Sequence, residues 1–156
     1  LGATPLRRGE LVTAKMLSVF VIELLQVLIL VPLGLLLGWQ GTDTNMLLVV
    51  PAVLLGTSAF TGIGLTLAGS LRGEINLAAQ NGLYLVLLLL GGMVIPMSSL
   101  PGPLRSVAEL LPSSALADVL RDSLTGAGNR VGLSWAVLSV WAVIAPAVAA
   151  RRFRWS

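Results

Sequence analysis

Charged residues divide this chain into four long apolar stretches, each about the length needed to cross a bilayer. A helix needs about 20 apolar residues to span the hydrocarbon core of a membrane. The stretches cover residues 16–38, 46–70, 77–95 and 133–150, and only the first contains a charged residue, Glu23. They lack the alternation of apolar and polar residues that is typical of the strands of membrane β-barrels. The sequence therefore predicts an all-α polytopic membrane protein with four transmembrane helices.

Composition excludes most soluble classes of protein. Hydrophobic residues make up 56% of the chain and charged residues 11%, against about 45–50% and about 25% in soluble domains. A soluble enzyme, a disordered segment or a nucleic-acid module would need more polar surface. The chain has no Cys and no His, and its carboxylates are not clustered. We therefore expect no catalytic residue, no metal site and no nucleic-acid partner.

The distribution of basic residues predicts an orientation. Three of the ten, Arg105, Arg121 and Arg130, lie in the connection 97–132, and the other seven lie near the termini or in the second turn. Basic residues favour cytoplasmic loops. We therefore expect a multi-pass protein of the plasma (inner) membrane with both termini of this chain in the cytoplasm.

The connection 97–132 carries signals for two short helices. Apolar residues recur at helical spacing before Pro112, which is expected to end the first helix. Ser113 or Ser114 can cap a second helix, and Gly126 is a natural stop. Both helices are too short to span a membrane. We expect them to lie at the outer interface or to dip into it.

The segment 4–15 predicts an amphipathic helix on the cytoplasmic side. Thr4 is a suitable N-cap, and Arg7, Arg8 and Glu10 form its polar part. Basic residues beside a membrane can hold a helix against anionic lipid. The alternative is that the segment docks onto a cytoplasmic partner.

Glu23 is the one ionisable residue well within a predicted span, and Gln26 lies on the same helical face. An acidic side chain at the centre of a membrane helix costs about 2.5–3.5 kcal/mol. Two interpretations remain open. The pair lines a substrate path or makes a polar contact between helices, or Glu23 reaches headgroups or a basic residue near the inner interface.

Two pairs of small residues, Gly34 with Gly38 and Ser58 with Gly62, have the spacing that lets membrane helices approach closely. Lipid provides no hydrophobic force between helices, so close packing of this kind matters there. We interpret both pairs as packing sites.

Two groups of residues resemble type-2 ABC transporter permeases, the membrane subunits of exporters for drugs, lipids and polysaccharides. The segment 3–15, followed directly by a span, is similar to the segment before the third membrane helix of that family. Pro96, Leu100-Pro101, Leu110-Leu-Pro112 and Ala117-Asp-Val-Leu-Arg121 are similar to a string that forms re-entrant outer helices between its last two spans.

The chain departs from the family pattern in two respects. Family members often have an aromatic residue soon after the second Leu-Pro, where this chain has Ser113-Ser-Ala-Leu. Members also have six spans, whereas four are predicted here. The resemblance therefore implies the C-terminal two-thirds of a permease, with two further helices upstream of Leu1.

The resemblance implies that a partner hydrolyses ATP. A phosphate-binding loop needs Gly-x-x-x-x-Gly-Lys-Ser/Thr, and the single Lys of this chain, Lys15, follows Ala14. An ABC nucleotide-binding ATPase, separate or fused, would therefore hold the ATP, and this chain would hold no cofactor. In the family, the segment similar to residues 4–15 is a coupling helix that contacts that ATPase. The contacts would be made by Thr4, Arg7, Arg8 and Glu10.

The function that the resemblance implies is export. We expect a permease subunit, paired as a homodimer or heterodimer, that moves small molecules such as drugs or antibiotics across the plasma membrane and so contributes to antibiotic resistance. Export of lipids or polysaccharides is the alternative within this class. A noncatalytic membrane scaffold is the alternative from another class.

Overall fold

The computed structural model describes residues 8–41, 44–92 and 94–152, and it contains no strand in this part of the chain. Four long helices are α1 (Arg8–Leu36), α2 (Met46–Ser70), α3 (Gly73–Leu90) and α6 (Val131–Arg152). Between α3 and α6 lie the 3-10 helix η1 (Met97–Ser99), α4 (Gly102–Glu109) and α5 (Pro112–Thr125). Each long helix is apolar and long enough to cross a membrane. The prediction of an all-α protein with four transmembrane helices is confirmed.

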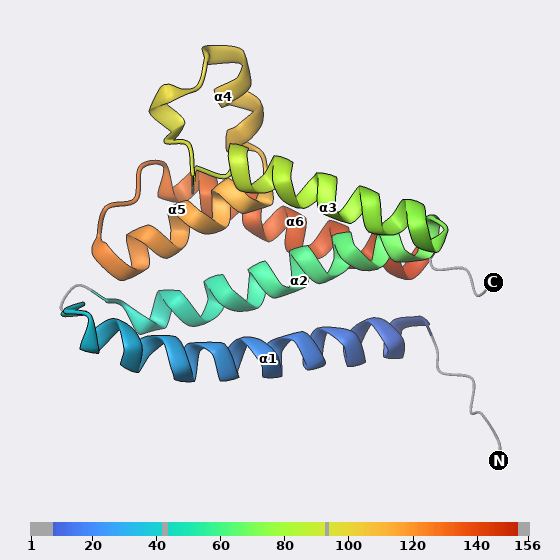
Figure 1. The fold of residues 1–156 in the computed structure, drawn as a ribbon, viewed down its shortest axis with the longest axis horizontal. Helices are drawn as coiled ribbons and strands as arrows, with labels where there is room; N and C mark the ends of the chain where they lie inside the picture. Colours follow the sequence, from blue (N-terminus) through green and yellow to red (C-terminus); the bar gives the residue numbers. More distant parts are fainter. Residues whose placement is uncertain (1–7, 42–43, 93, 153–156) are drawn as a thin grey trace.

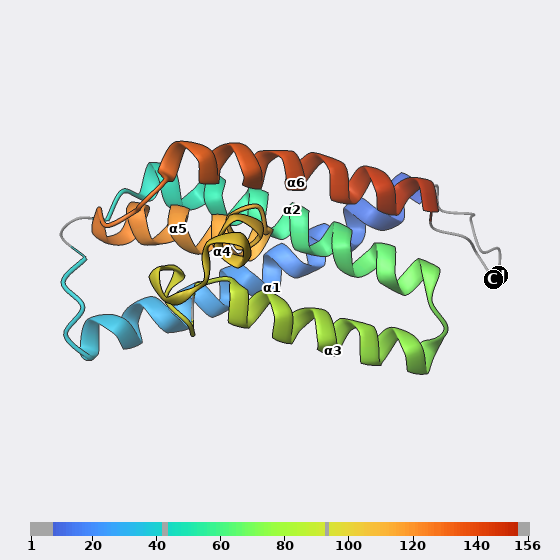
Figure 2. The same ribbon diagram turned by 90° about the horizontal axis from the view of Figure 1, so that it is seen from above.

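The long helices lie side by side along one axis (Figures 1 and 2). The start of α1, the α2–α3 connection and the end of α6 lie at one end of the bundle, which we call the Arg72 end. The α1–α2 and α5–α6 connections lie at the other, which we call the Gly126 end. Helix α4 projects from the side of the bundle beyond α5 (Figure 1).

Helices α2 and α6 form the core of the bundle, and small residues allow their close approach. A Cβ atom added at Gly62 would lie only 2.3 Å from the backbone nitrogen of Pro146. One turn earlier, the Ser58 hydroxyl donates a hydrogen bond of 2.6 Å to the carbonyl oxygen of Ala142. The interpretation of Ser58 and Gly62 as a packing pair is therefore confirmed.

The interpretation of the other small pair is wrong. Helix α1 ends at Leu36, and Gly38 lies beyond it with a φ of 96°, a left-handed conformation that favours glycine. A Cβ atom at Gly34 would meet the ring of Trp39, 3.5 Å away, in the turn that follows. The pair thus shapes the end of α1, and the helix ends before residue 38 because the chain turns there.

Helix α1 lies at the edge of the bundle, below α2 in Figure 1. None of its residues between Thr13 and Leu36 is buried by the rest of the chain. A helix that is apolar on all sides is typical of a membrane span, because lipid and neighbouring helices cover its surface. Residues 1–7, and with them much of the predicted helix 4–15, lie outside the described residues. From Arg8 onward the chain is helical without a break into the span.

The bounds of the other long helices differ from the apolar stretches by different amounts. Helix α2 has the bounds 46–70, and α6 extends beyond 133–150 at both ends. Helix α3 begins at Gly73 rather than at residue 77, and it includes Asn76 and Gln80, whose side chains hydrogen-bond to each other over 2.9 Å. It ends at Leu90 rather than at residue 95, because the chain turns at Gly92, where φ is 72°.

Candidate functional site

Helix α5 begins inside the bundle and runs to the Gly126 end. Its first residues, 112–115, are buried. Near this start, the Leu116 side chain lies so close to Gly56 of α2 that an added Cβ would be 2.9 Å from it. Gly56 is about 15 Å along α2 from Met46, given a rise of about 1.5 Å per residue. At the other end of α5, the Ser123 carbonyl oxygen accepts a bond of 2.7 Å from the Asn45 amide. Helix α5 therefore has the course of a re-entrant helix.

Local sequence explains how α5 begins and ends. Pro112 occupies the first turn of α5, where its fixed φ suits a helix. The expectation that Ser113 or Ser114 caps this helix is wrong, because Leu111 is the N-cap and both serines lie in the first turn. The Ser114 hydroxyl instead donates to carbonyl oxygens at and beyond the end of α4, those of Ala108 and Leu111. Gly126 ends α5 in the left-handed conformation, with a φ of 67°, as predicted.

Asp118 of α5 binds the start of α6. Its carboxylate accepts hydrogen bonds from the backbone amides of Asn129, at 2.9 Å, and Arg130, at 3.1 Å. It also accepts a bond of 2.9 Å from the Ser134 hydroxyl in the first turn of α6. These amides have no partner within the helix, so the carboxylate caps α6. Its negative charge also interacts favourably with the positive end of the helix dipole.

Glu109 joins α4 to the same region through two ion pairs. Its carboxylate lies 3.2 Å from Nε of Arg105, one turn earlier on α4, and 2.8 Å from a guanidinium nitrogen of Arg130. The Glu109 side chain is only 18% exposed, whereas that of Arg130 is 57% exposed. Partial burial of the carboxylate reduces screening by solvent, so this pair fixes α4 more firmly than a surface pair would.

The end of α3, η1, α4, α5 and the start of α6 line a partly open cavity of about 350 Å³, the α4–α5 cavity. One face of α5 lines it with residues at helical spacing, Ser114, Ala117, Asp118 and Arg121. Among the proline and arginine residues singled out from the sequence, Pro96 and Arg121 meet at this cavity. Pro101 and Pro112 do not line it.

Those two prolines have local roles instead. Pro101 is exposed and is the N-cap of α4. Pro112 is fully buried at the start of α5. Both thus set the path of the chain through the re-entrant segment.

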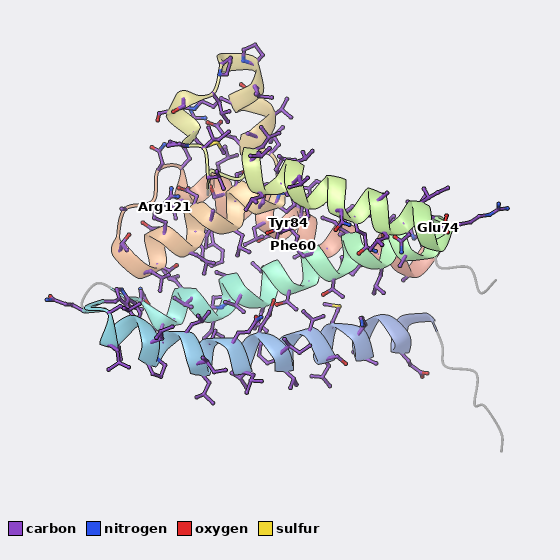
Figure 3. All side chains as sticks on the ribbon, in the orientation of Figure 1. Phe60, Glu74, Tyr84 and Arg121 are labelled. Carbon is purple, nitrogen blue, oxygen red and sulfur yellow. The ribbon has the colours of Figure 1, made fainter. Side chains whose placement is uncertain are left out.

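A second hollow, the α2–α3 groove, has a volume of about 330 Å³ and a mainly apolar lining. Phe60 of α2 and Tyr84 of α3, labelled in Figure 3, contribute aromatic rings to it. Ser113, at the start of α5, also lines the groove, and its buried hydroxyl oxygen has no hydrogen-bond partner in the described part of the chain. Grooves of this size and lining are typical of small-molecule sites.

Glu23 makes a contact between α1 and α2. The Thr57 hydroxyl, in a residue only 5% exposed, hydrogen-bonds to the Glu23 carboxylate and lies 2.8 Å from the carbonyl oxygen of Val53. Gln26 is exposed on α1. Thr57 was not singled out in the sequence, because a threonine within an apolar helix most often bonds to its own backbone.

The residues of the predicted coupling segment lie at the Arg72 end or outside the described chain. Thr4 and Arg7 precede the described residues. Arg8 is the first residue of α1, and Glu10 is exposed in its first turn. The described residues therefore place the start of this segment's helix at the same end as the α2–α3 connection (Figure 2).

Replacing Asp118 by Ala is expected to destabilise the contact between α5 and α6. The change leaves two backbone amides and a hydroxyl without their acceptor, which costs about 2 kcal/mol of unfolding free energy. Unfolding in mixed micelles with rising dodecyl sulfate, followed by tryptophan fluorescence, measures it. Asp122→Ala is the matched control, because it removes a carboxylate from the same helix that accepts no hydrogen bond within the described residues. Equal stability of the two variants would refute the capping role.

The described residues form four helices that are long and apolar enough to span a membrane, with a re-entrant helix between the last two, and this arrangement is that of a polytopic membrane protein with the features of a transporter permease. The comparison with protein-family models agrees with this class. The model described as ABC-2 type transporter matches residues 2–125, more than half of the chain. The chain therefore belongs to the ABC-2 type transporter family, as its sequence resemblance implied. Searches of curated proteins and of solved structures found no significant match.

Proposed function

We propose that this permease domain exports small molecules, such as drugs or antibiotics, across the plasma membrane, with energy from an ABC ATPase. The observation that carries the proposal is the re-entrant helix α5, which begins at mid-depth among α2, α3 and α6 within the residues that match the family. A short helix of this kind can close a path at the Gly126 end. A shift of α5 would open the path, and the bonds from Asn45 and Ser134 to α5 would hold it closed.

The size and lining of the hollows support a small substrate. The α2–α3 groove holds about 330 Å³ and is mainly apolar, with the polar hydroxyl of Ser113 at one side. This combination suits a drug-sized molecule with a hydrophobic body and few polar groups. A lipid or a long glycan would need a wider, continuous path, so those substrates are the alternative outcomes of the test.

The proposal assigns the two ends of the bundle to the two sides of the membrane. The Arg72 end, which carries the start of α1 and the end of α6, faces the cytoplasm, in keeping with the excess of basic residues there. The coupling segment 4–15 then lies on the side where the ATPase binds. Two permease domains, identical or different, form the complete transport path.

Co-purification with an ATPase tests the function. The chain, expressed within its full transporter, is expected to retain a nucleotide-binding ATPase in mild detergent. In liposomes, a panel of hydrophobic antibiotics is expected to stimulate ATP hydrolysis several-fold. Stimulation by lipid-linked glycans alone would favour the alternative substrates. The absence of any bound ATPase would contradict export and favour a membrane scaffold.

A further inference from the structure

The α4–α5 cavity carries more positive than negative side chains. Three arginines line it, and they come from three different segments: Arg105 from α4, Arg121 from α5 and Arg130 from the connection before α6. The carboxylates that line it are those of Glu109 and Asp118. The formal charge of the lining side chains is therefore positive, although the cavity lies within an apolar protein.

Both of these carboxylates are already engaged. Glu109 pairs with Arg105 and Arg130, so two of the cationic groups are neutralised in part by one shared anion. Asp118 accepts its three hydrogen bonds from the start of α6. The negative charge of the cavity is thus used to hold α4, α5 and α6 together.

Arg121 has no carboxylate partner in the described part of the chain. It lies one turn after Asp118 on the face of α5 that lines the cavity, and its side chain is exposed. Figure 3 shows it on α5, in the half of the bundle opposite Glu74. A guanidinium group beside a low-dielectric protein wall gains free energy from an anion that it can bind through two parallel hydrogen bonds.

We propose that the α4–α5 cavity is a binding site for a phosphate-type anion, with Arg121 as its principal ligand. The planar fork of Arg121 matches two oxygens of a phosphate group. Arg105 and Arg130 line the same cavity, and each uses one guanidinium nitrogen for its ion pair with Glu109, so its other nitrogens pair with no carboxylate in the described part of the chain. A volume of about 350 Å³ leaves room for the group and its waters. The anion is either a soluble phosphate or the headgroup of an anionic lipid. This site is independent of the proposed export activity.

The test measures anion binding by the complete transporter in nanodiscs of neutral phosphatidylcholine. Calorimetric titration with inorganic phosphate is expected to show binding to the unmodified protein. Arg121→Gln is expected to weaken it about tenfold or more, the effect of removing a charge-assisted hydrogen-bonding pair. Arg121→Lys is expected to fall between the two, because it retains the charge and loses the fork.

The matched control is Arg72→Gln, which removes the same charge from an exposed residue at the other end of the bundle. It is expected to leave phosphate binding unchanged. The unfolding midpoint of each variant without phosphate shows that the fold is intact, because Arg121 makes no ion pair with any described residue whose loss would lower that midpoint.

A second series of nanodiscs with phosphatidylglycerol separates the two sources of the anion. If the ligand is a lipid headgroup, native mass spectrometry is expected to show that Arg121→Gln retains one phosphatidylglycerol molecule fewer than the unmodified protein. Phosphate binding without this difference identifies a soluble anion. The proposal is overturned if the unmodified protein binds neither ligand, or if Arg121→Gln binds both as well as the unmodified protein does.

Discussion

Replacing Gly62 by Ala is expected to lower the stability of the bundle by about 3 kcal/mol, the upper part of the range for overpacking a tight contact. The added Cβ would lie 2.3 Å from the nitrogen of Pro146 and 2.5 Å from the carbonyl carbon of Ala145. Both atoms belong to the backbone of α6, so no side-chain rotation can relieve the overlap. Helices α2 and α6 would have to move apart. This movement would also weaken the hydrogen bond between Ser58 and Ala142.

Gly64→Ala is the matched control for this change. Gly64 lies on the same helix, and an added Cβ there meets no atom of the described residues within 4 Å. Both variants gain the same helix propensity, at most about 1 kcal/mol, so the difference between them isolates the packing term. Reversible unfolding by dodecyl sulfate measures both. If Gly62→Ala unfolds at the same detergent fraction as Gly64→Ala, the close contact of α2 with α6 is wrong.

Reversing the charges of Arg7 and Arg8 is expected to abolish transport while ATP hydrolysis continues. Under the proposed function, the segment 4–15 transmits the motion of the ATPase, and its cations contact that subunit. Helix α1 runs without a break from Arg8 to Leu36, so a displacement of this segment passes directly into the membrane. Glutamates at both positions would be repelled by the surface of the ATPase that binds these arginines. ATP hydrolysis would then no longer drive transport.

Reconstituted transporter measures both activities in the same preparation. Substrate uptake into inside-out liposomes is expected to fall more than tenfold, whereas the basal rate of ATP hydrolysis changes little. Arg151→Glu is the control, because Arg151 is an exposed basic residue near the end of α6, at the same end of the bundle. Transport at the normal rate in the double variant would exclude a coupling role for this segment.

The apolar stretches predict the transmembrane helices well because a span must satisfy all its backbone hydrogen bonds internally and expose apolar side chains to lipid. The ends of the helices are predicted less well, because local backbone geometry decides them. Gly38 and Gly92 adopt positive φ, and α1 and α3 end there, before the predicted apolar stretches 16–38 and 77–95 are complete. The hydropathy pattern does not distinguish these two glycines from Gly62 and Gly64, which lie within a helix.

The sequence predicts two helices in the re-entrant segment, but it does not predict their course through the bundle. The sequence predicts that Pro112 ends the first helix. In the structure it begins α5, because a proline fits the first turn of one helix as well as it ends another. The α4–α5 cavity depends on contacts between residues far apart in sequence. Asp118 caps a helix that starts beyond Gly126, and Glu109 pairs with Arg130. Of these contacts, the spacing along the sequence predicts only the ion pair of Arg105 with Glu109, which lie four residues apart.

The contact of Glu23 with Thr57 has a mechanical consequence. It is a polar attachment on a helix that has no buried residue between Thr13 and Leu36, and it lies near the middle of α1, with similar lengths of helix toward Arg8 and toward Leu36. A rigid rod held at its midpoint behaves as a lever with equal arms. A sideways push at the Arg8 end would therefore move the Leu36 end by a similar distance in the opposite direction, and with it the turn that leads into α2.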